Sequence, residues 1–303
     1  MSQTLTEQHK LHQRDLYDTH LLDDLPAQAG VFGFQKPKLI RDLFFERWLR
    51  KLHLQKGDRV LDVGCNAGAR LEQLRREFGI EGVGIDYSPN TVRAGVASFP
   101  KLELHAGDAE HLPFPDQSFD AVISFETFEH LPNPDQALAE MARVLKPGGK
   151  MLIYAISSQN TATWHWWQYH LTGGRLGTGA LKDHTPDLLI SPKELASWGR
   201  TSQLTSREWG YFHSFFTLLY DEVVVGVVAG LALALKKRIV HRSSLATPTR
   251  GADDLPQQPG RLFDLYKAWL YALASVLYLA DTPWRLLRFS DGIFVLFERP
   301  RTT

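Results

Sequence analysis

VLDVGCNAG (residues 60–68) is a short apolar run that leads directly into a glycine-containing turn. The β-branched residues before Gly64 predict a buried strand, and the small residues after it predict a tight turn into a helix. Gly64 and Gly68 let the backbone turn sharply and approach a ligand closely, while the first turn of the helix has unpaired N–H groups. The stretch therefore predicts a strand, a ligand-binding turn and a helix in succession.

Further short apolar runs surround this stretch, and longer helix-like segments separate most of them. The runs are GVGID (82–86), LELHAG (102–107), FDAVISF (119–125), GKMLIYAI (149–156), REWGYFH (207–213) and DGIFVLF (291–297). Alternating strands and helices of these lengths build a parallel sheet with helices on both faces. RVLKPGGKMLI (143–153) predicts a helix that ends in a Pro-Gly-Gly turn before a strand, and Ser191 with Pro192 predicts a capped helix start.

Composition separates the chain into four parts. Residues 1–55 mix charges with aromatics at helical spacing and predict a helical leader, which precedes the regular core at 56–214. Residues 215–290 contain two apolar segments and predict a helical hairpin or cap, and 291–303 form the last strand and a tail. Each apolar segment is about long enough to cross a bilayer but carries internal charges, so neither is a clean transmembrane span.

The charge balance and the cysteine content exclude several classes of protein. The 34 basic residues are offset by 34 acidic ones, which argues against an overall electrostatic grip on nucleic acid. A single cysteine, Cys65, excludes an intrachain disulfide and a cysteine-rich zinc site and fits a reducing compartment. The polar start lacks the apolar core of a secretory signal. We expect a cytoplasmic protein, with a peripheral membrane contact through 215–280 as the alternative to a soluble cap.

An acidic residue follows the second expected strand and points to the kind of ligand. Asp86 lies about 20 positions beyond the glycine turn, where a carboxylate accepts hydrogen bonds from a ribose diol. A nicotinamide dinucleotide or an adenosyl group would satisfy this pattern. The dinucleotide fingerprint, however, places glycines at positions held here by Gly64, Asn66 and Ala69, so its middle glycine is missing. Asp62 adds a carboxylate that suits an ammonium group better than a pyrophosphate.

Five motifs in order resemble one known family. VLDVGCNAG, GIDYSPN, GDAEHLPFPDQSFD, FETFEHLPNP and RVLKPGGKMLI are similar to the class I S-adenosylmethionine-dependent methyltransferases, specifically the methyltransferase type 11 group related to quinone and sterol methylating enzymes. The resemblance covers about residues 55–156. It implies a Rossmann-like α/β fold with a seven-stranded, mostly parallel sheet, an antiparallel last strand, and a helical insertion before that strand. It also implies S-adenosyl-L-methionine as the cofactor.

The same resemblance assigns cofactor contacts. It implies that Asp62, Gly64 and Gly68 bind the methionine part, that Asp86 binds the ribose, and that Asp108 with Ala109 binds the adenine. Asn66 stands where glycine is commoner, and we expect Cys65 to pack beside the cofactor rather than to act as a nucleophile. The full set of cofactor-binding candidates is Asp62, Gly64, Cys65, Asn66, Gly68, Asp86, Tyr87, Asp108, Ala109 and Phe125.

FETFEHLPNP (125–134) has three interpretations. His130, with Glu126 beside it, is a candidate general base for an acceptor hydroxyl, because histidine titrates near working pH. Glu126, Glu129 and His130 form an alternative divalent-metal set, which the resemblance to quinone O-methyltransferases suggests. The third interpretation is structural, with these residues holding the start of the next helix. The catalytic candidates are His130 and Glu126, and no metal ligand is assigned.

The sequence thus predicts an enzyme that transfers a methyl group from S-adenosylmethionine to an apolar or lipid-like small molecule. The aromatic run WHWWQYH (164–170) and His184 are candidates for the roof of the acceptor pocket. Two alternatives remain open: a soluble small-molecule methyltransferase with a helical cap, and a non-catalytic cofactor-binding scaffold. Whether the acceptor atom is oxygen, nitrogen or carbon is also open.

Overall fold

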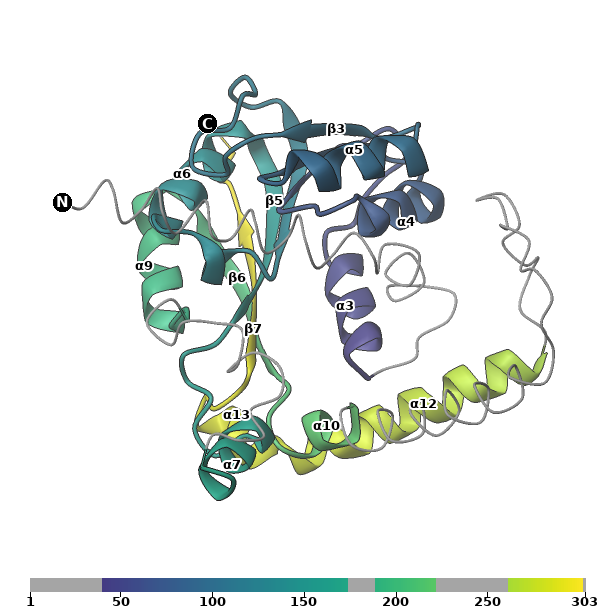
Figure 1. Cartoon of the computed structure of the whole chain (residues 1–303), viewed down its shortest axis with the longest axis vertical. Coiled ribbons are helices and arrows are strands. Elements are labelled where there is room, and N and C mark those ends of the chain that lie inside the picture. Colours follow the sequence, from purple (N-terminus) through teal and green to yellow (C-terminus); the bar gives the residue numbers. More distant parts are fainter. Residues whose placement is uncertain (1–39, 174–188, 222–260, 302–303) are drawn as a thin grey trace.

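A single mixed sheet forms the centre of the computed structural model, which describes residues 40–173, 189–221 and 261–301 (Figure 1). Its strand order is β3-β2-β1-β4-β5-β7-β6. The strands are β1 (Arg59–Val63), β2 (Glu81–Asp86), β3 (Glu103–Ala106), β4 (Phe119–Phe125), β5 (Leu145–Ile156), β6 (Thr205–Phe212) and β7 (Gly292–Glu298). β7 runs antiparallel to its neighbours β5 and β6, and the other pairs are parallel. The expected fold class is confirmed.

Helices cover both faces of this sheet. They are α3 (Ile40–Arg50), α4 (Ala69–Phe78), α5 (Pro89–Ser98), η2 (Phe128–His130), α6 (Pro134–Val144), α7 (Trp164–Leu171), α9 (Pro192–Thr201), α10 (Phe216–Leu219), α12 (Arg261–Ala280) and α13 (Thr282–Leu286). α3, α4 and α12 contribute to one apolar cluster, and α6 and α9 contribute to the other. In Figure 1 the two sets lie on opposite sides of the central strands, with α7, α10 and α13 gathered near one end of β6 and β7.

α3 lies inside the expected leader but packs as part of the core. The Trp48 ring stacks on the Phe294 ring of β7 with centroids 5.0 Å apart. Phe45 contacts the rings of Phe125 and Tyr154 at 5.1 and 4.7 Å. The approach is close enough that a Cβ at Gly210 would lie 2.2 Å from the Trp48 ring. The described part of the leader therefore packs tightly against one face of the sheet.

Local sequence signals explain two helix starts and miss one strand start. Ser191 and Glu194 form a reciprocal capping box before α9, as the Ser-Pro pair indicates. Gly68 precedes α4 with a left-handed φ of 80°. The expected Pro-Gly-Gly turn after α6 lies instead within β5, because Leu145 already pairs with Phe119 and the register shifts before Lys150 pairs with Ala121. The Pro-Gly-Gly residues, which predict a turn from sequence alone, therefore lie in an irregular part of the strand.

Some expectations fall outside the described residues. These are the leader before Ile40, His184 and most of the first apolar segment. The second apolar segment forms α12. None of the helices in the described part of the chain is both long enough and apolar enough to span a bilayer.

Candidate functional site

The candidate residues gather at the carboxyl ends of the parallel strands. The chain forms β1, β2 and β3 toward one edge of the sheet and then returns to place β4 beside β1. A crevice forms outside the strand ends at such a point of reversed order, and ligands of open α/β sheets bind there. Asp62 and Gly64 lie at the end of β1, Asp86 ends β2, and Phe125 ends β4.

The turn after β1 is shaped by left-handed backbone and close contacts. Gly64 has φ 75°, and a Cβ there would lie 2.1 Å from Oγ1 of Thr127. Asn66 also has a positive φ, 51°. Asparagine tolerates this conformation through local hydrogen bonds, and here Oδ1 of Asn66 accepts from the N–H of Ala67 at 2.7 Å. Asn66 therefore turns the chain where the related pattern more often has glycine.

Asp86 links this turn to the end of β2. Its Oδ2 accepts from the Asn66 N–H at 2.7 Å and its Oδ1 accepts from the Ser88 N–H at 3.0 Å. A carboxylate at the end of β2 can accept hydrogen bonds from a diol. The neighbouring Tyr87 side chain is exposed and lies at the same strand end.

Asp62 is a buried acid without a hydrogen-bond donor. Its side chain is fully buried, and neither carboxyl oxygen has a hydrogen-bond partner among the described residues. Burial raises its pKa to about 6, against the opposing charge of Arg70, while Asp86 raises it further. Arg70 Nη1 lies 3.9 Å from Asp62 Oδ1, beyond hydrogen-bond distance, and its guanidinium lies over the Phe125 ring. Buried carboxylates need compensation, so Asp62 suits an added cationic or N–H donor.

Cys65 is packed rather than poised for reaction. It is buried, and its N–H donates to the Ile85 carbonyl at 3.1 Å. Burial, together with the charges of Asp86 and Asp62, raises the thiol pKa well above its ordinary value. A thiolate is the reactive form of cysteine. These surroundings therefore disfavour nucleophilic chemistry.

Asp108 follows β3 in a tight local turn. Its Oδ1 accepts from the N–H of Glu110 at 2.9 Å, and its Oδ2 lies 3.8 Å from Nδ1 of His111. Ala109 packs against the apolar cluster under α6. The turn thus places the Asp108 carboxylate after β3, in the row of strand ends that includes Asp86.

The segment after β4 contains two acids in different surroundings. Glu126 adopts a left-handed φ of 53°, a strained conformation for a non-glycine residue, and pairs with Arg41 at 3.4 Å. Glu129 is buried, and its carboxyl oxygens make no hydrogen bond within the described residues. Burial raises the pKa of Glu129 to about 8, and Glu126 contributes in the same direction. Glu129 is therefore largely protonated at neutral pH.

His130 ends η2, immediately after Glu129. Its N–H donates to the Thr127 carbonyl at 3.0 Å, so the short helix fixes its backbone. In the ranges that the structure describes, no group of three or more His, Cys, Asp or Glu side chains is arranged to hold a metal ion.

Two residues near these strand ends have no signal in the sequence motifs. Arg41 comes from α3 and reaches Glu126 across 85 positions of the chain. Tyr154 lies in β5, where its carbonyl accepts from the Glu126 N–H at 2.9 Å. From sequence alone, an aromatic residue in an alternating strand pattern predicts a core position, and an arginine in a leader helix predicts a surface position. Arg41 and Tyr154 come close to each other only because α3 packs on the sheet.

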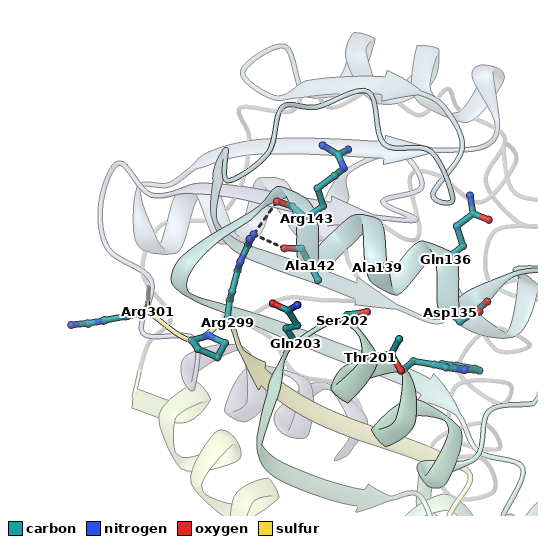
Figure 2. A pocket seen from close by; sticks show the side chains of 12 residues that line it. Asp135, Gln136, Ala139, Ala142, Arg143, Thr201, Ser202, Gln203, Arg299 and Arg301 are labelled. Carbon is teal, nitrogen blue, oxygen red and sulfur yellow. Dashed lines mark hydrogen bonds between the residues drawn. The ribbon is translucent and has the colours of Figure 1, made fainter. Parts of the chain in front are cut away.

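A groove of about 610 Å³ lies elsewhere, between α6 and α9 (Figure 2). Arg299 crosses its wall and donates through Nη1 to the carbonyls of Ala142 and Arg143 at 2.8 and 3.0 Å. Its lining includes Gln136, Trp198 and Arg301 but none of the candidate site residues. The groove is therefore separate from the candidate site.

Comparison with known proteins agrees with this geometry. Residues 61–153 match a family model described as a methyltransferase domain. These residues make up a region similar to a methyltransferase domain. This region contains the ends of β1, β2 and β4 and all ten candidate cofactor-binding residues.

Relatives of the methyltransferase domain include a protein named demethylmenaquinone methyltransferase from Listeria welshimeri. The chain is 37% identical to it over 123 residues, which cover 38% of this chain and 52% of that protein. The chain thus spans about half the length of this relative.

Solved structures share the fold at low identity. A Haemonchus contortus phosphoethanolamine N-methyltransferase 2 in complex with S-adenosyl-L-methionine aligns with a TM-score of 0.56 at 19% identity, covering 95% of this chain and 60% of that chain. The [4+2]-cyclase SpnF aligns with a TM-score of 0.51 at 18% identity, covering 86% and 81%. At these sequence identities the similarity concerns the fold alone.

Proposed function

We propose that this protein transfers a methyl group from S-adenosylmethionine to an apolar, quinol-like small molecule. The observation that carries the proposal is Asp62, a fully buried carboxylate without a hydrogen-bond donor among the described residues, at the glycine turn of a methyltransferase domain. The ammonium group of the cofactor's methionine part is the kind of donor that such a carboxylate needs. When bound, the cofactor supplies an electrophilic methyl group on a positively charged sulfur.

Neighbouring residues suit the rest of this cofactor. The Asp86 carboxylate, which accepts from the Asn66 and Ser88 N–H groups, is of the chemical type that accepts hydrogen bonds from ribose hydroxyls. Asp108 and Ala109 follow β3, where the resemblance to class I methyltransferases puts the adenine. Gly64 and Gly68 add no side chains to the turn, and Tyr87 and Phe125 follow as further candidate contacts at the ends of β2 and β4. Cys65 contributes packing beneath the turn.

On the acceptor side, the residues position a nucleophile and exclude water. Methyl transfer needs the lone pair of the acceptor in line with the methyl carbon, and holding it there supplies much of the rate enhancement. We assign to His130, which follows β4, the role of taking a proton from an acceptor hydroxyl, with Glu126 as the second catalytic candidate. Phe45 and Phe125, which immediately precedes Glu126, pack against each other in the apolar cluster on the α3 side of the sheet, with ring centroids 5.1 Å apart. The name of the Listeria welshimeri relative supports a quinone-type acceptor.

An exposed apolar stripe on α12 supports contact with a membrane that contains such an acceptor. Leu265, Trp269, Val276 and Leu279 recur at helical spacing, and each is more than half exposed. The opposite side of the helix buries Leu270. No charged residue occurs from 268 to 280. One apolar side of α12 packs against the protein, and the other apolar side is exposed to water. Insertion of that exposed side into a bilayer interface would remove it from water without a protein partner.

Residues beyond α12 extend this surface. Leu286 and Leu287 are exposed, and Arg288 follows them as an exposed cation. Apolar surface with basic edges favours anionic lipid, because each basic residue contributes roughly 1 kcal/mol near an anionic surface. We therefore place the peripheral contact at α12 and α13, within the 215–290 insertion.

A labelling experiment tests the methyl transfer. The protein is incubated with methyl-labelled S-adenosylmethionine and either a lipid extract or an aqueous extract, and mass spectrometry identifies the labelled product. We expect label in an apolar quinol from the lipid extract. Label confined to the aqueous extract would favour the soluble small-molecule enzyme, and cofactor binding without label in either extract would favour the non-catalytic scaffold.

Vesicle flotation tests the membrane contact. Wild-type protein should float with phosphatidylcholine vesicles that contain phosphatidylglycerol, and the double variant Trp269→Gln, Val276→Gln should float less. Val96→Gln is the matched control, because Val96 is an exposed apolar residue on α5, away from the stripe. If the wild-type protein stays at the bottom of the gradient, the membrane contact is wrong and the helical-cap alternative replaces it.

A further inference from the structure

Tyr154 is a buried phenol that lies on the α3 side of the sheet, near the end of β5. Its side chain is 3% exposed and packs against the rings of Phe45 and Phe294 at 4.7 and 4.6 Å. Core positions in strands are more often filled by aliphatic residues or phenylalanine, because a buried hydroxyl needs a hydrogen-bond partner. The hydroxyl of Tyr154 therefore calls for a functional or structural reason.

The phenol points toward the strand ends that form the candidate site. Tyr154 pairs in register with Phe294, but a Cβ built at Gly292 would lie 2.3 Å from its hydroxyl. Gly292 is the register partner of Ile156, two positions closer to the carboxyl end of β5. The side chain thus runs along the sheet from the level of residue 154 to the level of residue 156. Glycine at 292 leaves the space that the hydroxyl occupies.

Charged residues surround this end of the phenol. The Tyr154 carbonyl accepts from the Glu126 N–H, which joins the two backbones at the strand ends. The charges of Glu126, Asp291 and Glu129 raise the pKa of the phenol beyond the effect of burial, and Arg41 acts against them. The net shift is well above the ordinary tyrosine value, so the hydroxyl keeps its proton at neutral pH and can donate it.

The hydroxyl has no hydrogen-bond partner within residues 40–173, 189–221 and 261–301. A hydroxyl without a partner in the protein is a basis for selectivity, because a ligand that supplies an acceptor is favoured over an isostere that lacks it.

We propose that the Tyr154 hydroxyl donates a hydrogen bond to a ring oxygen of the methyl acceptor, so that the site selects phenols and quinols over hydrocarbons and amines. Tyr154 is then a specificity-determining residue that touches the substrate. Arg41, held by Glu126, adds a positive charge on the same side, which favours an oxygen with partial or full negative charge. This inference rests on the proposed methyltransferase function and names its substrate class.

Paired ligands that differ by one oxygen test the proposal. We would titrate the full-length protein, saturated with S-adenosylhomocysteine, with 1-naphthol and with naphthalene. Wild type should bind 1-naphthol about tenfold more tightly or better, the scale of one hydrogen bond. Tyr154→Phe removes only the hydroxyl, and it should reduce that preference to threefold or less while leaving the naphthalene affinity unchanged.

Tyr211→Phe is the matched control, because Tyr211 is a half-buried phenol on β6, on the other side of β7 from β5. It should keep the wild-type preference. An unchanged preference in Tyr154→Phe overturns the inference, and so does the failure of both ligands to bind a protein that binds S-adenosylhomocysteine. If S-adenosylhomocysteine itself does not bind, the proposed function fails first and the inference falls with it. Equal melting temperatures for wild type and Tyr154→Phe exclude misfolding as the cause of any change.

Discussion

The backbone N–H of Asn66 and Oδ2 of Asp86 are 2.7 Å apart, which joins the turn after β1 to the end of β2. The turn and the carboxylate are therefore one structural unit. Asn66 tolerates the left-handed backbone at this turn, and its own side-chain Oδ1 accepts a hydrogen bond from the N–H of the next residue, Ala67. The unit holds the Asp86 carboxylate in place at the end of β2.

Removing the Asp86 carboxylate should weaken cofactor binding. Asp86→Ala leaves the ribose diol without its acceptor, a loss of roughly 1–3 kcal/mol for hydrogen bonds to a charged group. Affinity for S-adenosylmethionine and S-adenosylhomocysteine should fall about tenfold or more by calorimetry. Glu81→Ala, at the exposed opposite end of β2, is the matched control. Unchanged affinity in Asp86→Ala would contradict the ribose assignment.

His130 and Asp108 should separate turnover from cofactor affinity. His130→Ala should lower turnover by about 10²–10⁴, the usual contribution of a general base, with little change in cofactor affinity. Asp108→Ala should mainly weaken cofactor binding. Steady-state kinetics with the acceptor from the labelling screen measures both, and His105→Ala on β3 is the control. If His130→Ala turns over normally, only the structural interpretation of His130 remains. If a chelator abolishes activity and magnesium restores it, the metal interpretation is favoured instead.

Glu129 should make the ligand-free protein less stable as pH rises. Its folded-state pKa, about 8, lies above the unfolded value of 4.5. The folded state therefore holds this proton more tightly, and the stability that it contributes is lost as pH rises from about 4.5 through 8. Glu129→Gln cannot ionise, so it should match wild type near pH 4.5 and be more stable at pH 8 in thermal denaturation.

Glu140 provides a control of opposite sign for that measurement. Hydrogen bonding to Arg143 lowers the pKa of Glu140, so its contribution is present above its unfolded value and lost in acid. Glu140→Gln should change stability above that range and not below it. A pH profile of Glu129→Gln that parallels wild type across pH 4.5–8 would refute the buried, protonated state of Glu129.

Asp221 should stabilise the start of α3 from a distant part of the chain. Its carboxylate accepts from the N–H groups of Ile40 and Arg41 at 2.8 and 2.9 Å and also contacts His213. Side chains that bond the first N–H groups of a helix contribute about 1 kcal/mol. Asp221→Ala should lower the free energy of unfolding by at least that amount in urea. Asp116→Ala removes a largely exposed ion pair with Arg143 and should have a smaller effect, and equal effects would contradict the capping role.

Local chemistry let the sequence determine most of the fold by itself. The strands at 59–63, 119–125 and 292–298 follow from runs of apolar residues, and the turn at Gly64 follows from glycine's conformational freedom. The capping box at Ser191 involves residues three positions apart. Each of these depends on a few neighbouring residues. The strand start at Leu145 was misread as a turn because its pairing partner, Phe119, is far away in the sequence.

Tertiary structure alone decided which polar groups meet at the strand ends. Arg41 reaches Glu126 across 85 positions, and Asp221 bonds Ile40 across 181. The direction of the Tyr154 phenol depends on the absence of a side chain at Gly292 in an antiparallel neighbour. No periodicity in the sequence encodes these contacts, because they form only when α3 and β7 pack against the sheet. Burial then sets the protonation of Glu129 and Tyr154, since desolvation depends on everything packed around a group.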